Sequence, residues 1–569
     1  MRYLALAVDY DGTAASHDKL AESVRRAIER LRTSGRRVVL VTGRRLDDLL
    51  RVCPAIASFD LVVAENGAVV YDPSRREDIA LGVPVPNQVV DRLRERGVDP
   101  IEIGKVLVAT HDPHGAVVFD VIRELGLELQ VIANRSAIMV LPAGINKATG
   151  LKFALHKLGL SQHEAVAIGD AENDHSLLMY CECGVAVANA VSSLKDSAAF
   201  VTRASNGDGV AELIDELIAN DLERMEGKIE RHLVLLGERS DGTEVRIPPY
   251  GRNVLIAGPS GSGKSTLTAG LIERLIEKAY QVCIIDPEGD YSTLRAVMSL
   301  GNPRRAPSVN EVLSVLEDPA ASPSINLLGL RLEDRPLFFS QLIPGLLALR
   351  ARTGRPHWIV LDEAHHMLPQ TWGHAASTLP QKLGETILVT VHADHVAPAV
   401  LAPIDVVFAI GHSPEKTLGT YAHAAGQRLT WPEGLGSEEG KVVAWFVRDN
   451  EMPFSMRPQP GRAERIRHLR KYAEGNMHYR SFFFRGPDNR HNLRAQNLGV
   501  FCQIAEGIDE PTWMFHLQSQ DYSRWFRHAI KDDYLADEME RIERRTDLSP
   551  DQARHLVREL VAARYTLPE

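Results

Sequence analysis

The sequence predicts two α/β domains in succession, followed by a mainly helical C-terminal segment. Short apolar runs that end in polar or acidic residues recur through the N-terminal third, which is typical of buried parallel strands. A further run at 253–257 leads into a glycine-rich loop and then a helical pattern. With 569 residues the chain also exceeds what one hydrophobic core usually organises, so we expect several domains.

Composition and charge restrict the class of protein. Apolar residues make up 44% of the chain and charged residues 25%, and no apolar run has the roughly 18 residues that span a bilayer. The N-terminus resembles a first strand more than a targeting segment, so we expect no membrane segment and a cytoplasmic location. The net charge of −10 gives no broad electrostatic reason to bind nucleic acid, and five scattered cysteines fit reduced thiols better than disulfides.

The first elements form a βαβ unit. Residues 3–9 and 36–42 are the first two expected strands, and apolar residues at helical spacing between them end at Gly35, which can close a helix. Runs at 61–64 and 165–168 repeat the strand pattern. We therefore expect parallel strands whose carboxyl ends carry the functional residues.

Two aspartates follow the first strand at a spacing that suits phosphate chemistry. Alternation along an extended segment directs Asp9 and Asp11 to the same side. One carboxylate can attack phosphorus and form an aspartyl-phosphate, while the other protonates the leaving oxygen and then activates water. Thr42 offers a hydroxyl to a phosphoryl oxygen, and Lys147 supplies a cation that offsets charge in the transition state.

A second acidic cluster follows the strand at 165–168. The segment 169–174 (GDAEND) places hard oxygen ligands at that strand end, as Mg²⁺ demands. A lone D-x-D-G-T would also fit an acidic turn that caps a helix. Here four polar elements occur in order, each after a strand, which favours a site for phosphoryl chemistry.

The motifs DYDGT, VTGR, AENGA, GINKATGL and GDAEND resemble the haloacid dehalogenase (HAD) superfamily, specifically its Cof-like members. The resemblance covers about residues 1–220 and implies a Rossmann-like core with a small inserted α+β cap at about 73–142. It implies Asp9 as nucleophile and Asp11 as general acid/base. It also implies phosphate contacts by Thr42, Gly43, Lys147 and Asn173, and Mg²⁺ ligation by Asp9, Asp11, Asp170 and Asp174.

The cap is where this family keeps its substrate selectivity. Arg135 lies just before the chain returns to the core and could reach a second anionic group on the substrate, although an exposed loop arginine is an equal alternative. The short cap and the close spacing of Lys147 and Asp170 resemble archaeal-type phosphoglycolate phosphatases and sucrose- or mannosylglycerate-phosphate phosphatases. This resemblance implies a small phosphorylated acid or sugar as substrate.

The strand at 253–257 opens the second domain, after a charged and breaker-rich boundary at about 224–252. It runs into GPSGSGKS, which satisfies G-x-x-x-x-G-K-S in a strand–loop–helix context. The backbone amides would cradle phosphates at a helix N-terminus, Lys264 would reach the β and γ oxygens, and Ser265 would bind Mg²⁺. ATP binding is therefore expected, through Gly258, Gly261, Gly263, Lys264, Ser265 and Thr266.

A later acidic strand end fits ATP hydrolysis. The run 358–363 (WIVLDE) ends in paired acids, of which Asp362 suits the metal and Glu363 suits polarising an attacking water. His392 follows another strand, where it could sense the γ-phosphate or serve as a hydrogen-bonded structural histidine. The candidates for an arginine finger are Arg350, Arg352 and Arg355.

The pattern GPSGSGKST, IIDPEGDY, VLDEAHH and VTVHAD resembles the HerA/FtsK-like branch of ATPases over about residues 245–415. Members of this branch often form hexameric rings that pump DNA or protein, which implies a homo-oligomer. We do not recognise the β-barrel that DNA-pumping relatives carry in front, and the phosphatase occupies its place. The resemblance thus supports nucleotide binding and leaves translocation in doubt.

The expected domains are a HAD phosphatase at 1–222, a P-loop ATPase at 223–460 and a helical accessory domain at 461–569. The last domain begins with a basic stretch that is more typical of a solvated helix face than of a nucleic-acid site. Its aromatic residues are more typical of a core than of base stacking.

The leading hypothesis is a protein in which the ATPase regulates or oligomerises an Mg²⁺-dependent phosphatase. The second is a translocating motor for DNA or protein with a phosphatase for nucleotides or nucleic-acid ends. The third is a kinase–phosphatase pair, against which Glu363 beside Asp362 counts. The fourth is a nucleotide-dependent scaffold with an inactive phosphatase, against which the complete set of phosphatase residues counts.

Overall fold

The computed structural model describes residues 1–16, 19–134, 136–225, 227–292, 294–370, 384–435, 441–461, 477, 480–530, 532–563 and 565. The chain forms two compact units. Unit 1 comprises Met1–His232 with Ala351–Gly354, and unit 2 comprises Leu233–Arg350 with Arg355–Glu569. Among the described residues, no helix combines the length and the apolar character needed to cross a membrane.

Unit 1 is built on an eight-stranded sheet in the order β14-β13-β12-β1-β4-β5-β6-β7. The strands from β14 to β5 run parallel, and β6 and β7 add an antiparallel edge. The central strands are runs of buried apolar residues, because helices cover both of their faces. Their bounds are β1 (Ala5–Asp9), β4 (Arg37–Val41), β5 (Leu61–Ala64), β6 (Val69–Asp72), β7 (Glu77–Ala80), β12 (Ala165–Gly169), β13 (Cys183–Ala186) and β14 (Phe200–Val201).

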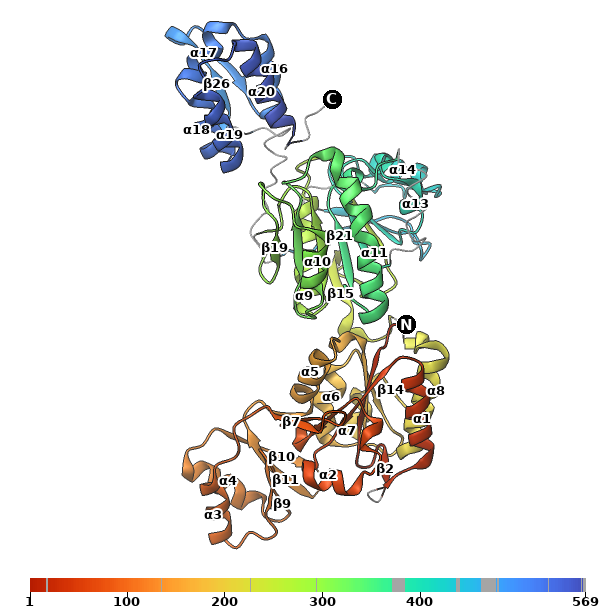
Figure 1. The fold of residues 1–569 in the computed structure, drawn as a ribbon. Helices are drawn as coiled ribbons and strands as arrows, with labels where there is room; N and C mark the ends of the chain where they lie inside the picture. Colours follow the sequence, from red (N-terminus) through yellow and green to blue (C-terminus); the bar gives the residue numbers. More distant parts are fainter. Residues whose placement is uncertain are drawn as a thin grey trace. The chain divides into compact units, whose positions relative to one another are not determined.

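The helices of this core lie on both faces of the sheet, α1 with α8 on one face and α5 with α6 on the other (Figure 1). The apolar stripe that predicts the first helix is buried through Val24, Ala27, Ile28 and Leu31. Gly35 follows the end of that helix with a φ of 91°, as expected for a helix terminator. The elements are the hairpin β2 (Ala15–Ser16) and β3 (Lys19–Leu20), with α1 (Glu22–Thr33), α2 (Leu46–Val52), α5 (Lys147–Lys157), α6 (His175–Tyr180), α7 (Ser192–Ser197) and α8 (Asn206–Asn220).

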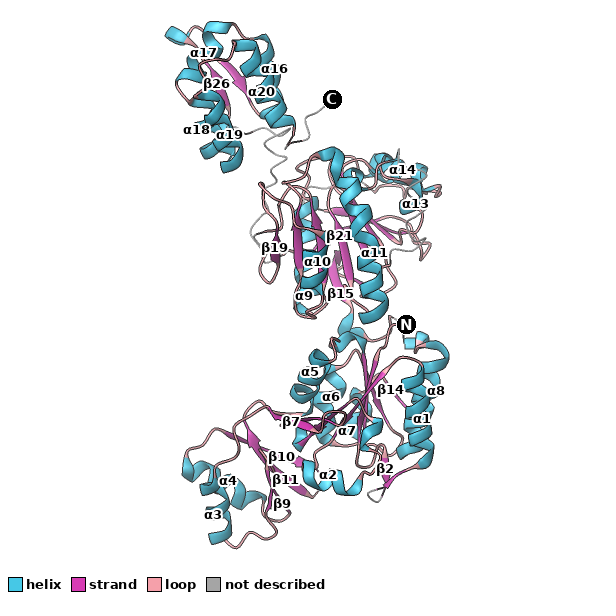
Figure 2. Ribbon diagram, viewed as in Figure 1, coloured by secondary structure: helices cyan, strands magenta, loops and turns pink. Residues whose placement is uncertain are grey.

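An α+β insertion between β7 and α5 corresponds to the expected cap. Its antiparallel sheet has the order β10-β11-β9-β8, and two helices pack on one face of it around a separate hydrophobic core (Figure 2). We call this insertion the cap. Its elements are α3 (Asn87–Glu95), β8 (Glu102–Ile103), β9 (Val108–His111), α4 (Gly115–Leu125), β10 (Leu129–Asn134) and β11 (Ala137–Pro142).

Unit 2 contains an eleven-stranded sheet in the order β16-β15-β25-β24-β23-β17-β22-β21-β18-β20-β19. The strands from β23 to β19 are parallel, and the other four extend one edge in antiparallel fashion. The two faces carry separate hydrophobic cores, one formed with α9 and the other with α10 and α11. This is the doubly covered parallel sheet that the apolar strands predict.

The strands of that sheet are β15 (Val234–Arg239), β16 (Glu244–Ile247), β17 (Val254–Ala257), β18 (Val282–Asp286), β19 (Met298–Leu300), β20 (Pro323–Asn326), β21 (Trp358–Leu361), β22 (Thr386–Thr390), β23 (Val406–Ala409), β24 (Val442–Phe446) and β25 (Phe454–Pro458). Its helices are α9 (Lys264–Glu277), α10 (Val309–Leu316), α11 (Arg335–Thr353), α12 (Ala364–Met367), α13 (Pro398–Leu401) and α14 (Pro414–Ala425).

The C-terminal part of unit 2 is mainly helical, with one short hairpin (Figure 2). Its aromatic residues form a core, in which Phe484, Trp513, Tyr522 and Phe526 are fully buried. The expectation that the aromatic residues are core is confirmed for these four, whereas Phe515 is 39% exposed. The basic stretch before them lies outside the described residues. The elements are β26 (Phe482–Phe484), β27 (Leu493–Ala495), α16 (Leu498–Gly507), α17 (Glu510–Gln518), α18 (Asp521–Trp525), α19 (Asp533–Glu543) and α20 (Pro550–Ala562).

A buried network in unit 1 joins its first residues to its last turn. The Glu182 carboxylate accepts hydrogen bonds from Arg2 Nη2 at 2.6 Å and from His163 Nδ1 at 2.7 Å. His232 Nε2 bonds the main-chain oxygen of Glu182 at 3.0 Å. Burial alone would raise the pKa of Glu182, but the hydrogen bond and charge of His163 outweigh burial and lower the pKa to about 2. Glu182 is therefore ionised at neutral pH and holds this network together.

Glu182→Gln is expected to destabilise unit 1, because Arg2 and His163 would lose a buried anionic partner. Removing one side of a buried ion pair costs on the order of 3–5 kcal/mol. Denaturant unfolding at pH 7 measures the change. Glu29→Gln, which breaks a solvent-exposed pair with Arg25, should cost less than about 1 kcal/mol in the same assay.

This difference in stability should depend on pH. The pKa of Glu182 is depressed on folding, so its contribution is fully present above the ordinary value of 4.5 and is lost as the pH falls toward 2. Wild type and Glu182→Gln should therefore converge in acid. Equal stability of the two proteins at pH 7 would refute the role given to Glu182.

Candidate functional site

The carboxyl ends of two neighbouring strands bring three aspartates together in unit 1. Asp9 ends β1, Asp170 directly follows β12, and Asp174 lies four residues further along. One carboxylate oxygen from each lies within 4.8 Å of the others, and no side chain of the three is more than 4% exposed. The structure thus assembles three of the four aspartates that the motifs single out.

Lys147, the first residue of α5, is inserted into this cluster. Its Nζ donates to Asp9 Oδ1 at 2.6 Å and to Asp174 Oδ1 at 2.5 Å. Burial alone would lower the pKa of Lys147, but Asp174 and Asp9 raise it above its ordinary value, so Lys147 stays an ammonium. Burial, followed by the charge of Asp174, raises the pKa of Asp9 well above its ordinary value. Three carboxylates against one ammonium leave buried negative charge, and an oxygen-rich anionic set of this kind fits Mg²⁺.

Neighbouring groups hold two of these carboxylates in place. Asp174 Oδ2 accepts the backbone N–H groups of Asp170 and Ala171, each at 3.0 Å. The Thr13 hydroxyl donates to Asp170 Oδ1 at 3.2 Å. Such contacts orient carboxylates before any ligand arrives.

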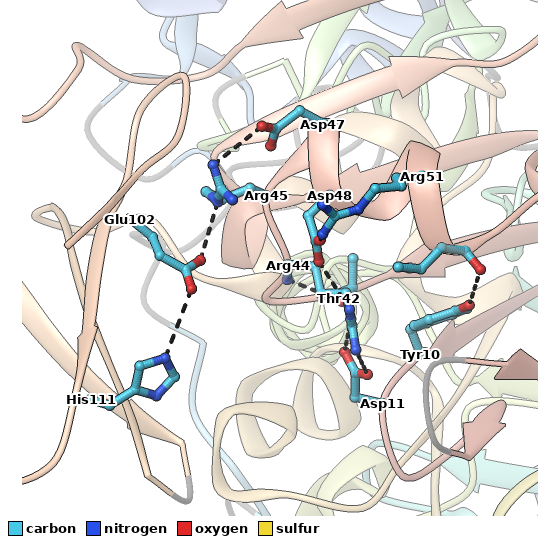
Figure 3. A network of polar contacts seen from close by, with 11 residues as sticks. Tyr10, Asp11, Thr42, Arg44, Arg45, Asp47, Asp48, Arg51, Glu102 and His111 are labelled. Carbon is cyan, nitrogen blue, oxygen red and sulfur yellow. Dashed lines mark hydrogen bonds and ion pairs between the residues drawn. The ribbon is translucent and has the colours of Figure 1, made fainter. Parts of the chain in front are cut away.

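Asp11 has a different partner from Asp9. Its carboxylate accepts hydrogen bonds from Arg44 Nε at 2.8 Å and Nη2 at 2.6 Å, and its side chain is 43% exposed (Figure 3). Asp11 is not part of the cluster of three aspartates, and the chain turns directly after it at Gly12, whose φ is 77°. The Arg44 N–H also donates to Thr42 Oγ1 at 3.1 Å, which places the Thr42 hydroxyl in the same network.

The remaining expected phosphate contacts lie along the same edge of the sheet. Asn173 Nδ2 donates to Asn66 Oδ1 at 3.1 Å. A Cβ built on Gly43 would lie 3.5 Å from Asn173 Nδ2 and 3.4 Å from the sulfur of Met139 in the cap. The cap therefore approaches the core closely at Gly43, next to the motif residue Thr42.

In unit 2 the loop between β17 and α9 depends on its glycines. Gly258, Gly261 and Gly263 have φ values of 157°, 74° and 106°, which side-chain-bearing residues rarely adopt. A Cβ on Gly258 would lie 2.2 Å from the main-chain oxygen of Ile410. These glycines let the loop turn its backbone around the start of α9, where a helix N-terminus favours anions.

The first residues of α9 carry the side chains expected at ATP. Lys264 and Ser265 are buried, and Thr266 is exposed. Lys264 Nζ donates to the main-chain oxygen of Pro259 at 3.1 Å, so the ammonium lies against the loop that would hold phosphates. This is the position from which a lysine can reach the β and γ oxygens.

Asp362 and Glu363 directly follow β21, whose neighbour is β22. Both are buried, and the Glu363 N–H donates to Asp362 Oδ1 at 2.9 Å. Glu363 has left-handed backbone angles, φ 44° and ψ 51°, which cost a residue with a side chain on the order of 1–3 kcal/mol. The nearby Tyr291 is fully buried, and burial, followed by the charge of Asp362, raises its pKa well above the ordinary value.

The other residues that the sequence singled out for ATP chemistry divide into an exposed and a buried group. His392 follows β22 and is exposed. Arg350 and Arg355 are largely or fully buried and donate to backbone carbonyls of unit 2, so these two candidates for an arginine finger are wrong. Such a finger has to reach outward to a neighbouring copy. Arg352 is exposed.

Comparison with known proteins identifies the family of unit 1. The pattern of the haloacid dehalogenase-like hydrolases matches residues 6–96 and 99–214. A phosphoglycolate phosphatase of Archaeoglobus fulgidus is 32% identical over 217 residues, and one of Natronomonas pharaonis is 33% identical over 231 residues. Each alignment covers 37% of this chain and 96% of the relative. The chain belongs to the haloacid dehalogenase-like hydrolases.

A second family follows the hydrolase in the same chain. The pattern of the helicase HerA central domain matches residues 239–343. The protein is therefore a fusion of a HAD-type phosphatase with a HerA-like domain. A crystal structure of a haloacid dehalogenase-like hydrolase from Bacteroides thetaiotaomicron is 23% identical, covers 38% of this chain and 100% of its own, and has a TM-score of 0.34.

A contact between the core and the cap of the hydrolase unit was not predicted from the sequence. Glu65 and Asn66 have φ values of 52° and 53° directly after β5. The Glu65 carboxylate accepts the backbone N–H groups of Lys105 and Val106 at 2.8 Å and of Leu107 at 3.1 Å. One buried carboxylate thus fastens the β8–β9 turn of the cap to the end of a core strand. The signal in the sequence is the Asn-Gly that follows Glu65, which favours positive φ.

Arg45 forms a second link between the hydrolase core and the cap (Figure 3). Its Nε donates to Glu102 Oε2 at 3.2 Å, and its Nη1 donates to the main-chain oxygen of Ile103 at 3.3 Å. Glu102 Oε1 also lies 3.9 Å from His111 Nε2. Arg135, which we singled out for the cap, lies outside the described residues.

Glu65→Gln is expected to loosen the β8–β9 turn. The new side chain would replace one accepting carboxylate oxygen by an NH₂ group, which cannot accept the backbone N–H groups of the turn. Loss of a charge-assisted bond of this kind costs about 1–3 kcal/mol, which corresponds to roughly 5- to 150-fold faster amide exchange. Hydrogen exchange at residues 105–107 measures the effect. Glu77→Gln, on the exposed strand β7, is the control, and unchanged exchange at 105–107 in Glu65→Gln would show that the turn does not need this carboxylate.

Proposed function

We propose that unit 1 is an Mg²⁺-dependent phosphomonoesterase that acts through an aspartyl-phosphate on a small phosphorylated acid or sugar. The observation that carries the proposal is the buried cluster of Asp9, Asp170 and Asp174 around the Lys147 ammonium. This cluster has excess negative charge, which a divalent cation would neutralise, and a phosphoryl group needs the same cation. Similarity to phosphoglycolate phosphatases supports the class of substrate.

The roles of the residues follow from their positions. Asp9 would attack phosphorus, so that the new bond from its carboxylate oxygen to phosphorus forms as the ester bond breaks. Asp11 would protonate the leaving oxygen, after Arg44 has released it, and would then accept a proton from the water that hydrolyses the aspartyl-phosphate. Lys147 would hold a phosphoryl oxygen beside Asp9. When bound, Mg²⁺ would offset the charge of the phosphoryl oxygens from a site formed by Asp9, Asp11, Asp170 and Asp174.

Further residues would complete the substrate site. The Thr42 hydroxyl, the backbone at Gly43 and the Asn173 amide would contact the phosphoryl group. The cap would select the rest of the substrate, with Arg135 as the candidate for a second anionic group. Because two links tie the cap to the core, we expect the substrate to displace side chains rather than the whole cap.

We propose further that unit 2 binds and hydrolyses ATP with Mg²⁺. The loop at 258–265 would hold the phosphates, and Asp362 and Ser265 would hold the metal. Glu363 would polarise the attacking water, and His392 would sense the γ-phosphate. The nucleotide state would then regulate the phosphatase or assemble it into a ring. We propose that the chain divides into domains at 1–222, 223–460 and 461–569.

The match to the HerA helicase domain favours a second candidate function. In it, unit 2 would move along nucleic acid while unit 1 removes phosphates from nucleotides or strand ends. The two candidates differ in substrate size and in the effect of DNA. Stimulation of ATP hydrolysis by DNA, with binding that weakens steeply as salt rises, would favour the motor.

Asp9→Asn is expected to lower phosphate release by at least about 1000-fold, because removing a nucleophile abolishes the covalent step. Release is measured from phosphoglycolate, sugar phosphates, nucleotides and oligonucleotides with 3′ or 5′ phosphates. Chelation by EDTA should remove the wild-type activity, and Mg²⁺ should restore it.

Asp215→Asn, which changes a surface pair with Arg30, is the matched control and should leave the rate unchanged. Hydrolysis of oligonucleotide ends alone would favour the motor. Activity that persists in Asp9→Asn, or that ignores chelation, would refute the proposed mechanism.

Lys264→Ala is expected to lower ATP hydrolysis by about 100-fold or more, because an ammonium that offsets phosphate charge is lost. Phosphate release from ATP and binding of a fluorescent ATP analogue measure the effect. Lys416→Ala, an exposed lysine of α14, serves as the control. If Lys264→Ala also alters the phosphatase rate in the presence of ATP, the two units are coupled. Label that passes from the γ-phosphate to an acceptor other than water would instead support a kinase.

A further inference from the structure

Thr390, the buried last residue of β22, joins three segments of unit 2. Its main-chain oxygen accepts the N–H of Gly258, the first glycine of the P-loop, at 3.3 Å. Its hydroxyl oxygen accepts the N–H of His392 at 3.2 Å and lies 3.1 Å from His365 Nδ1. One residue therefore contacts the phosphate-binding loop, the histidine after β22 and the segment after β21.

The protons of this network can be assigned from its geometry. The Thr390 hydroxyl donates to the main-chain oxygen of His392 at 3.1 Å. Because a hydroxyl has a single proton, a Thr390 that donates to His392 accepts from His365, and His365 Nδ1 then carries a hydrogen. The same Nδ1 lies 3.4 Å from Glu363 Oε2, which as a carboxylate oxygen also accepts. His365 Nδ1 thus lies closer to the Thr390 hydroxyl, at 3.1 Å, than to Glu363 Oε2, and its contact with Glu363 is electrostatic.

The surroundings restrict the movement of this imidazole. The side chains of His365 and Glu363 are 9% and 6% exposed. The His365 ring packs against His366, at 4.1 Å between centroids, and its edge faces His392 at 6.3 Å. Glu363 itself has left-handed backbone angles, so its side chain does not project as it would from a helix. The position of its carboxylate therefore depends on side-chain contacts, including the one with His365.

We propose that His365 is a positioning residue that sets the direction of the Glu363 carboxylate and passes changes at the P-loop to it through Thr390. A phosphate that binds the loop would change the position of Gly258 and, through their hydrogen bond, the end of β22. Thr390 Oγ1 would move with the strand, and His365 and Glu363 would follow. This inference rests on the proposed hydrolysis of ATP by unit 2. It adds a route by which phosphate bound at the P-loop controls the position of the Glu363 carboxylate.

The test uses the full-length chain with His365→Leu, His365→Asn and Thr390→Val. His365→Leu should keep ATP binding within about 2-fold of wild type and lower kcat by roughly 10- to 100-fold, the usual effect of losing a partner that orients a site residue. His365→Asn should restore kcat to within a few-fold, because its amide N–H can occupy the position of Nδ1–H. Thr390→Val should lower kcat in the same way, and its effect should not add to that of His365→Leu.

The control is His423→Leu, an exposed histidine of α14, which should leave kcat and KM unchanged. Circular dichroism and thermal unfolding of each variant show whether its fold is retained. Wild type that binds ATP without hydrolysing it, or that does not bind it, overturns the proposed ATPase and this inference with it. Wild type that hydrolyses ATP leaves the ATPase standing. In that case the inference is overturned by an unchanged kcat in His365→Leu, by a parallel loss of ATP binding, or by an Asn variant as slow as the Leu variant.

Discussion

The ammonium of Lys147 between Asp9 and Asp174 is the interaction on which the active edge of unit 1 depends. Ionised carboxylates that are buried side by side repel each other, and each costs several kcal/mol to remove from water. Lys147 offsets part of that cost at a defined position, because Asn146 caps the start of α5 with reciprocal hydrogen bonds to Thr149. The negative charge that remains would attract a cation and, through it, a phosphoryl group.

The strands that carry the site could be predicted because their signal is local. Asp9, Thr42 and Asp170 each follow an apolar run, and parallel pairing of β1 with β4 and β12 brings those strand ends to one edge. The partner of Asp11 could not be predicted in this way. Asp11 pairs with Arg44, and this contact joins residues 33 positions apart that no periodicity encodes.

The same distinction holds in unit 2. The glycines of the P-loop could be recognised from the sequence motif, and the structure explains why one of them is needed. A Cβ on Gly258 would collide with the main chain just after β23. Arg350 and Arg355 give no such signal, and their sequence positions alone suggested a role at a neighbouring copy. In the folded chain Arg350 donates to the carbonyls of Pro356 and His357 just before β21, and Arg355 donates to the carbonyl of Leu316 at the end of α10, which is a structural role.

Asp9 of unit 1 and Glu363 of unit 2, the two buried carboxylates proposed to take part in catalysis, are held by different kinds of contact. This difference has a functional consequence. Asp9 is held by an ammonium whose attraction depends little on direction, so small shifts of the surrounding chain leave the pair intact. Glu363 Oε2 lies 3.4 Å from Nδ1 of the His365 imidazole, and a contact with a ring nitrogen weakens as the angle or distance changes. The pair of Asp9 and Lys147 in unit 1 is therefore in place before any ligand binds, whereas the site of unit 2 can be assembled or released by a small movement of β22. Of the two, unit 2 is the one whose architecture suits control by the molecule it binds.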